Sequence, residues 1–223
     1  MSTKITTHYF EYGVHKYFRG NAHLVEPGTF GEKKDPVGIK AYIEPAGVIK
    51  PAYLDGRLKV NTRVKIDWST VSSGDLQAGA TLKFLSLGVS AATSFDYNKA
   101  KTAKLELVNL SIDEIPLVRM LNDADVARGF LAEEGADGRI VSEYWIVVDA
   151  QLGEHFAANE GAAVAVKALG NQANLTIGGG AQGSQTVTMS PGTTFAYKLH
   201  KVSDWSKGKD SVLKVEGDYK GMS

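Results

Sequence analysis

Segments in which apolar and polar residues alternate strictly are the feature that most limits the fold of this 223-residue chain. In residues 58–67, LKVNTRVKID, the even positions are apolar or threonine, and charged or amide side chains stand between them. The same period of two runs through 85–97 and 144–152. Successive side chains of a strand point to opposite faces, so these segments predict strands with one buried and one solvated face. Such strands pair most readily into an antiparallel sheet.

The composition is that of an ordinary globular protein, with 43% hydrophobic and 22% charged residues. Lys plus Arg and Asp plus Glu both number 25, so no net charge attracts the chain to nucleic acid or to an acidic membrane. There is no cysteine, which excludes disulfides, thiolate nucleophiles and cysteine-based zinc sites. No stretch approaches the ~20 apolar residues of a membrane-spanning helix, and the N-terminus lacks the apolar core of a secretion signal. We therefore expect synthesis as a soluble cytoplasmic protein.

Two helices are predicted from a period close to 3.6 residues. In residues 6–19, Phe10, Val14 and Phe18 recur every four positions. This helix either docks on the core or lies, with its aromatic and basic residues, at a lipid headgroup surface. The second helix falls within residues 111–138.

The domain organisation follows from the end of the last alternating segment. Residues 1–202 are expected to form one domain of the α+β class. Residues 203–223 are polar, and we expect a loose tail or a short surface helix.

Enzymatic motifs are absent or fail on their context. Residues 178–183, GGGAQG, match a dinucleotide-binding pattern, but the strand-like SQTVTM follows where a helix should begin. The five histidines show no metal-ligand spacing, and none stands beside a recognisable nucleophile. The sequence thus predicts no enzyme activity, no cofactor and no metal site.

Three segments, in this order, resemble the pore-forming domain of the gasdermin family. They are SLGVSAATSFDYNKAKTAKLELVNLSIDEIPLVRMLN, GRIVSEYWIVVDAQLGEHFA and TVTMSPGTTFAYKLHKV. The resemblance covers roughly residues 58–202. It implies a soluble monomer built on a twisted antiparallel sheet with flanking helices.

The resemblance also implies a mechanism. Two regions, about 58–110 and about 139–190, would refold into two long hairpins per subunit, and many subunits would close into a transmembrane β-barrel. The implied partners are an acidic phospholipid membrane and further subunits, either identical or variants of the same family. The chain would be cytoplasmic when inactive and at the cell membrane when active, where it would cause lytic cell death. Short microbial members are triggered by contact with a variant protein or by proteolysis of the tail; both triggers stay open here, and the lack of cysteine favours the first.

Candidate membrane residues follow from the alternation and from the resemblance. A membrane strand needs about 9–11 residues that alternate between lipid and water. The predicted lipid-facing residues are Leu85, Leu87, Val89, Ala91 and Phe95 in the first hairpin, and Tyr144, Ile146 and Val148 in the second. The predicted lipid-binding residues are Phe10, Val14, Lys16, Phe18 and Arg19, joined by Lys33 and Lys34.

The alternation also has a plainer interpretation. Any antiparallel sheet with one solvated face shows the same pattern. The alternative function is therefore a non-enzymatic β-rich binding or structural module that never meets a membrane.

Overall fold

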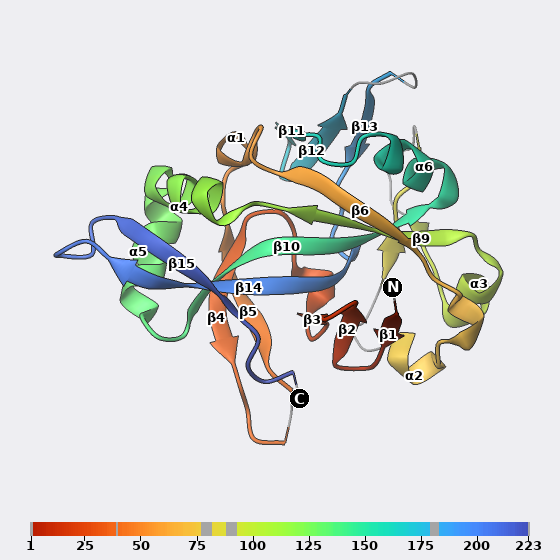
Figure 1. Ribbon diagram of the computed structural model, residues 1–223, viewed down its shortest axis with the longest axis horizontal. Coiled ribbons are helices and arrows are strands. Elements are labelled where there is room, and N and C mark those ends of the chain that lie inside the picture. Colours follow the sequence, from red (N-terminus) through yellow and green to blue (C-terminus); the bar gives the residue numbers. More distant parts are fainter. Residues whose placement is uncertain (1, 39, 77–81, 88–92, 179–182, 223) are drawn as a thin grey trace.

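A large, curled antiparallel sheet organises the chain in the computed structural model, which describes residues 2–38, 40–76, 82–87, 93–178 and 183–222 (Figure 1). One path through this sheet runs β1-β2-β3-β14-β10-β4-β5, with β15 paired to β14 and the β6–β9 pair joined to β10. Its strands are β1 (Thr3–Ile5), β2 (Tyr9–Tyr12), β3 (His15–Phe18), β4 (Thr29–Lys34), β5 (Tyr42–Val48), β6 (Lys59–Lys65), β9 (Leu105–Ser111), β10 (Gly138–Asp149), β14 (Thr194–Trp205) and β15 (Val212–Asp218).

The long strands β10 and β14 lie at the centre, and each is shared by two neighbours on its outer edge. β10 pairs with β4 through Gly138–Ile140 and with β9 through Val147–Asp149. β14 pairs with β3 at Tyr197 and with β15 from Leu199 onward. The sheet therefore divides on both sides of the central pair. β4 and β9 branch from β10, and β3 and β15 branch from β14.

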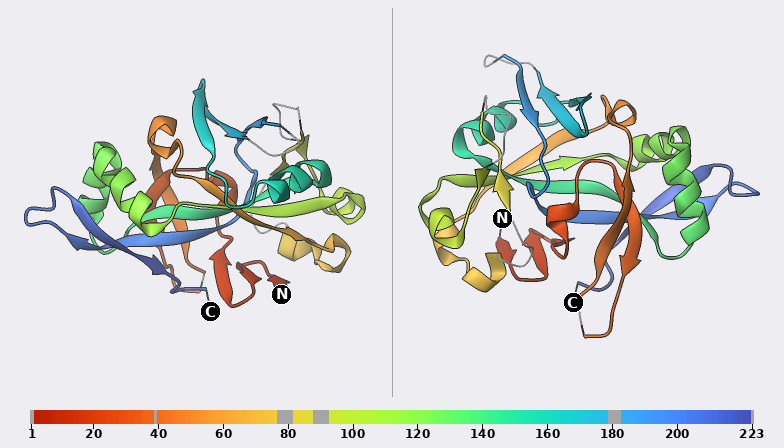
Figure 2. Two further views of the ribbon diagram at one scale, coloured as in Figure 1. Left: turned by 45° about the horizontal axis from the view of Figure 1, so that its top comes forward. Right: turned by 180° about the vertical axis from the view of Figure 1, so that it is seen from behind.

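Two hydrophobic cores lie on opposite faces of this sheet. Tyr144, Ile146 and Val148 belong to the larger core, whereas Trp145 and Val147 belong to the smaller one, as the alternation of a strand requires. Figure 2 shows the elements of the two cores on opposite sides of the sheet. The larger core packs against α1 (Pro51–Leu54), α4 (Glu114–Asp123), α5 (Asp125–Glu134), α6 (Ala150–Ala158) and a small sheet of β11 (Ala165–Leu169), β12 (Gln172–Ile177) and β13 (Gln185–Thr188). The smaller core lies under β1–β3, η2 (Trp68–Thr70), α2 (Ser73–Leu76) and α3 (Tyr97–Thr102).

The predicted α+β class with mostly antiparallel strands is confirmed. The predicted common face of Tyr144, Ile146 and Val148 is also found, and all three side chains are buried. The helix expected within 111–138 is present as two helices, which meet at Ala124.

The predicted helix over residues 6–19 is wrong, because these residues form the β2–β3 hairpin. Phe10 pairs with Tyr17, and Gly13 makes the turn with a φ of 63°. A four-residue spacing of aromatic residues also fits two short strands of period two, and aromatic side chains favour strands. Gly13, which adopts a positive φ readily, decides for the turn.

The predicted strand over 139–152 ends at Asp149. The Asp149 carboxylate accepts a hydrogen bond of 2.8 Å from the Leu152 backbone N–H and so caps α6. Ala150 and Leu152 are consequently helical, and the strand face ends at Val148.

Residues 203–223 are not a loose tail, because most of this segment belongs to the sheet. β14 continues to Trp205, and β15 pairs with it as far as Asp218. Asp218 is buried and binds two cations: its Oδ2 lies 2.8 Å from Lys33 Nζ and 2.8 Å from an Arg139 terminal nitrogen. Three strands, β4, β10 and β15, are thereby joined by one carboxylate.

The pKa of Asp218 lies below its usual value. Burial acts to raise it, but hydrogen bonds from Lys33, from the Lys220 backbone N–H and from Arg139 outweigh burial. A carboxylate with a lowered pKa contributes stability above its unfolded pKa, and that stability is lost as the pH falls through the folded value.

We predict that Asp218→Asn lowers the free energy of unfolding at neutral pH by about 3 kcal/mol, because two buried cations lose their counter-charge. Urea unfolding measures this loss. Asp204→Asn, the same change at an exposed site on β14, should cost less than about 0.5 kcal/mol. Equal losses in the two variants would contradict the assignment.

Candidate functional site

Four neighbouring strands, β6, β9, β10 and β14, form an antiparallel ribbon whose connections leave from one end. Lys65 lies opposite Glu106, Leu105 opposite Asp149, and Ile146 opposite Thr194. β6 therefore ends where β9 begins, and β10 ends where β14 begins, at the right of Figure 1. Two long insertions emerge side by side at this end.

The insertions replace what would be short turns in an ordinary meander. The first, residues 66–104, contains η2, α2, β7 (Lys83–Phe84), β8 (Thr93–Ser94) and α3, and the second, residues 150–193, contains α6 and β11–β13. Each holds roughly 40 residues, about twice the length that a bilayer-crossing hairpin needs. The small sheet of the second insertion projects away from the main sheet in Figure 2.

The small sheet β11–β12–β13 has one apolar and one polar face. Val166 and Leu175 pair with one another, are buried, and belong to the larger core. On the polar face, the hydroxyls of Thr176 and Thr186 lie 2.8 Å apart, and Thr188 donates to Asn174 over 2.7 Å. The face therefore carries a ladder of neutral hydrogen-bonding side chains across β12 and β13, and the exposed Lys167 of β11 lies beside it, opposite Asn174.

The β11–β12 hairpin has the same register as the central part of the β10–β14 pair, from Glu143–Lys198 to Trp145–Ala196. Trp145 lies opposite Ala196 in the outer pair, and Ala165 lies opposite Thr176 in the inner hairpin. The distance along the chain from Trp145 to Ala165 equals that from Thr176 to Ala196. Extended outward, the inner pairing would therefore meet the Trp145–Ala196 pair in register, once the bulge that now shifts the last pair, Ile146–Thr194, by one residue is removed.

The faces of the two pairs match as well. Even positions carry the apolar face in both β10 (Tyr144) and β11 (Val166), and odd positions carry it in both β12 (Leu175) and β14 (Tyr197). Side chains alternate with a period of two, so one continuous hairpin without the bulge after Trp145 would keep each apolar row on one face. Phe195, which lies in the smaller core in this fold, would then join the row of Tyr197.

The predicted lipid-facing residues of the first hairpin lie in different surroundings. Leu85 is fully buried, and its backbone bonds to Val147 and Asp149 over 3.0 Å. Leu87 is half-buried beside the larger core, and Phe95 packs edge-on against Trp68 with ring centroids 6.2 Å apart. Val89 and Ala91 lie outside the described residues. The predicted row 85–97 is thus not one strand in this fold.

The predicted lipid-binding residues do not form one surface. Phe10 and Phe18 are completely buried, so they cannot contact a lipid surface in this fold. Arg19 is also buried: it donates to the backbone oxygens of Thr6 and Asp75, and its guanidinium lies 4.2 Å from the Phe195 ring centroid. Burial lowers the pKa of Arg19 to about 10.

The other four predicted lipid-binding residues are partly accessible. Val14 is 91% exposed at the hairpin turn, and Lys16 lies 4.6 Å above the Tyr9 ring. Lys33 is held by Asp218, and Lys34 binds Glu32 and Glu44 at 2.5 and 3.4 Å. Only Val14 and Lys16 of the seven line a common hollow.

A polar cluster on β10 was not predicted. Glu143 accepts hydrogen bonds from Tyr17 over 2.8 Å and from Asn109 over 3.0 Å, and lies 3.7 Å from Lys198. Burial and the neighbouring Glu143 raise the pKa of Tyr17 well above its usual value. The polar positions between the apolar residues of 139–152 were the signal for this cluster, but its partners come from distant strands.

His200 lies between Ser142 and Glu114. Its Nδ1 is 2.6 Å from Ser142 Oγ, and its Nε2 is 3.6 Å from a Glu114 carboxylate oxygen. Ser142 is 1% exposed, so a substrate has no access to this hydroxyl. Burial, followed by the charge of Lys198, lowers the pKa of His200 to about 4, and the group is a neutral structural histidine at pH 7.

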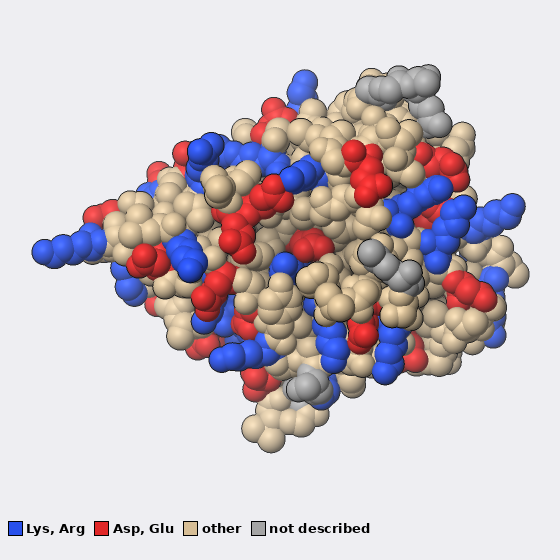
Figure 3. All heavy atoms as spheres, viewed as in Figure 1, with Lys and Arg blue, Asp and Glu red and all other residues tan. Residues whose placement is uncertain are grey.

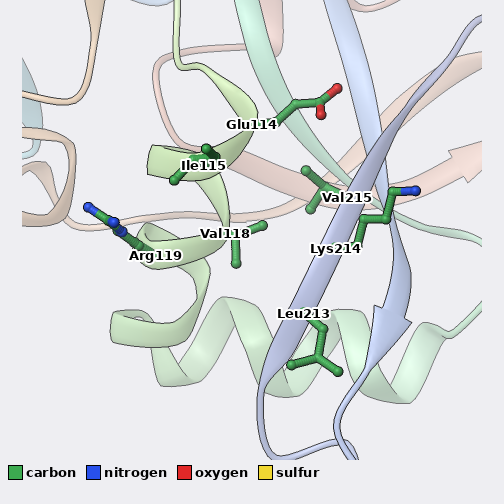
Figure 4. Close-up of a pocket in the computed structure, with 7 residues that line it drawn as sticks. All are labelled: Glu114, Ile115, Val118, Arg119, Leu213, Lys214 and Val215. Carbon is green, nitrogen blue, oxygen red and sulfur yellow. The ribbon is translucent and has the colours of Figure 1, made fainter.

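Charges and clefts complete the surface. Lys and Arg side chains mingle with Asp and Glu over the face seen in Figure 3. A cleft of about 260 Å³ lies between α4 and β15, where Ile115, Val118 and Leu213 meet (Figure 4). Across the described ranges, no cluster of metal-ligating side chains occurs, and no helix is long and apolar enough to cross a membrane.

No protein-family model, no curated protein and no solved structure significantly matches the chain.

We predict that His200 makes the stability depend on pH between about 6.5 and 4. The unfolded chain binds a proton at this residue below its ordinary pKa, whereas the folded chain does so only near 4. Stability is therefore complete above about 6.5 and is lost as the pH falls toward 4.

Urea unfolding at a series of pH values tests this behaviour. Between pH 7 and pH 4, the wild type should lose roughly 3 kcal/mol more than His200→Asn, which cannot titrate. His15→Asn, a change in the exposed β2–β3 turn, should behave as the wild type. Identical pH profiles for wild type and His200→Asn would refute the assignment.

Proposed function

We propose that this chain is a gasdermin-like pore-forming protein, which inserts the two insertions into an acidic-lipid membrane as lengthened hairpins and oligomerises into a β-barrel. In this proposal the protein catalyses no reaction. It opens a pore in the membrane, and the pore causes the death of the cell that contains it. The proposal combines the order of the three sequence segments with the geometry of the four-strand ribbon.

The register that β11–β12 shares with the central β10–β14 pairs, such as Trp145–Ala196, carries the proposal. A strand pair that lengthens by one residue at a time must keep its register, because a slip of one residue moves every side chain to the other face. The inner hairpin already pairs Ala165 with Thr176, as the lengthened ribbon would require. Conversion then needs α6 and the adjoining loops to become strand, β13 to leave β12, and the bulge between Trp145 and Ile146 to be removed, while Ala165–Thr176 and Trp145–Ala196 keep their partners.

The side chains of the small sheet suit a bilayer. Its apolar row would face lipid, and its threonines and asparagine would face water inside a barrel. All backbone groups of a closed barrel pair between strands, which hydrocarbon requires. The ladder of uncharged side chains on the wet face would line the lumen, and Lys167, opposite Asn174, would add one positive charge in each subunit.

The soluble fold opposes the conversion and therefore calls for a trigger. Leu152, Phe156 and Leu175 of the second insertion and Leu85 of the first are fully buried in the larger core. Releasing them exposes apolar area worth about 1.5–3 kcal/mol for each side chain. Burial of the same apolar area in a bilayer offsets this free-energy cost, whereas exposure of it to water does not.

Paired charge variants on neighbouring residues of β11 test the proposal. Ala168 lies on the apolar face opposite Ala173, and Leu169 lies on the polar face opposite Gln172; both are exposed. We predict that Ala168→Lys strongly reduces dye release from acidic-lipid vesicles, because a lysine on the lipid face costs up to about 2–4 kcal/mol in each subunit. Leu169→Lys should leave release within about twofold of wild type.

The vesicle assay is run on the intact chain and after limited proteolysis, since the trigger is open. Both variants should have the same midpoint of urea unfolding as the wild type, because both side chains are exposed. Vesicles that stay sealed with wild type under both conditions would favour the alternative, a binding or structural module. Equal release by the two variants would remove β11 from the membrane-crossing hairpin.

A disulfide lock provides a second test on this cysteine-free chain. Lys59 and Ala163 lie directly opposite one another in an antiparallel bridge that ties the second insertion to β6. We predict that oxidised Lys59→Cys/Ala163→Cys releases at least tenfold less dye than the same protein after reduction, because the insertion cannot leave the body. The two single-cysteine variants should show no dependence on reductant. Full release by the oxidised double variant would show that the insertion stays docked.

A further inference from the structure

A basic cleft lies where the second insertion meets the body. Its volume is about 440 Å³. The charged residues that line it are Arg57 after α1, Lys59 at the start of β6, Asp113 just before α4, and Arg119 on α4. The remaining lining residues are Gly56, Pro116, Gly161 and Ala163. Three cations and one carboxylate thus face one space. The cleft is distinct from the polar cluster around Glu143 and from the faces of the small sheet.

Arg119 is the exceptional residue of this cleft. Each of the other described arginines binds an acceptor: Arg19, Arg57, Arg63, Arg128 and Arg139. Within the described part of the chain, Arg119 has no hydrogen bond or ion pair. A guanidinium presents a planar set of donors that matches phosphate oxygens, so an unpaired Arg beside two further cations is suited to a phosphoryl group.

The two other cations are paired with carboxylates that are exposed to solvent. Arg57 binds Asp123, and Lys59 binds Asp113, and the two carboxylates are 50% and 56% exposed. Exposed ion pairs contribute about 0–1 kcal/mol, so an incoming dianion can take both cations at little cost. Asp113 is also the residue before α4, but its side chain does not cap the helix. The positive end of the ten-residue α4 adds to the potential of the cleft.

The cleft borders the backbone bonds that hold the second insertion closed. Val164 N–H donates to Leu58 O over 2.6 Å, and Val60 N–H donates to Ala162 O over 3.1 Å. Arg57 and Lys59 belong to the body side of this junction, and Gly161 and Ala163 belong to the insertion side. A ligand seated between them contacts both sides at once.

We propose that this cleft binds a phosphoryl group, from a free phosphorylated compound or from a lipid headgroup, and that the bound ligand holds residues 161–164 against β6. Arg119 and Arg57 bind the phosphoryl oxygens, and Lys59 supplies the third charge. The binding step does not depend on pore formation: a chain that never enters a membrane would still carry this site.

Thermal unfolding with pyrophosphate as the probe tests the site. At a concentration about 100-fold above Kd, pyrophosphate should raise the Tm of wild type by about 5–10 °C. Arg119→Ala should lose most of this shift, and because Arg119 is exposed and unpaired, its own Tm without ligand should match wild type. Lys207→Ala, which removes an exposed cation from the β14–β15 turn, should keep the full shift.

A second arm separates the two sources of the phosphoryl group. Flotation with vesicles of phosphatidylcholine alone is compared with flotation with vesicles that also contain phosphatidic acid. A pyrophosphate shift that depends on Arg119 supports a free ligand, and flotation that depends on both phosphatidic acid and Arg119 supports a headgroup. If neither probe binds, or if Arg119→Ala binds both as wild type does, the proposal is overturned.

Hydrogen exchange tests the coupling to the insertion. Bound pyrophosphate should slow exchange at the Val164 amide at least tenfold, and it should leave unchanged the Ser206 amide, which donates to Ser211 O across the β14–β15 turn. Binding without slower exchange at Val164 would support the phosphoryl site, but it would refute the claim that the bound ligand holds residues 161–164 against β6.

Discussion

Backbone pairing between β10 and β14 is the interaction on which the rest of the structure depends. These two long strands bury side chains on both faces, with Tyr144 and Tyr197 in one core and Trp145 and Ala196 in the other. All other strands of the main sheet join this pair directly or through one or two neighbours. Because both faces of the pair are occupied, it fixes the register of β4, β9, β3 and β15, and with it the end at which the insertions emerge.

Sequence patterns predicted the parts of the fold that depend on local alternation. The common face of Tyr144, Ile146 and Val148 follows from a period of two, and the residues around Met120 follow from a period near 3.6. The spacing of Phe10 and Phe18 led to a wrong prediction, because it fits both a helix and a hairpin of two short strands. Only the turn at Gly13 distinguishes the two structures. Asp149 as a helix cap would have been recognisable, but the strand-like residues on both sides obscured it.

Contacts between side chains that are far apart in the sequence could not be predicted from it. Asp218 is one acid in a polar segment, and nothing near it in the chain indicates that Lys33 and Arg139 surround it. The same holds for Arg119, whose lack of a partner is visible only once Arg57 and Lys59 lie beside it. The register that the Ala165–Thr176 and Trp145–Ala196 pairs share likewise becomes visible only from the pairs themselves, because α6 interrupts the alternation between them.

The two insertions differ in how far they are arranged for lengthening. Extending β6–β9 outward from the Lys65–Glu106 pair would place Lys83 opposite position 88, but Lys83 pairs with Ser94. The first insertion must therefore shift its register by an even number of residues, which preserves its faces but breaks the β7–β8 pairs. The second insertion keeps its β11–β12 pairs, such as Ala165–Thr176, but it must lose the bulge between Trp145 and Ile146 and the pairs of β12 with β13. Because β11–β12 is already in the register of Trp145–Ala196, lengthening of the second insertion first would present the edge of a finished strand to the first.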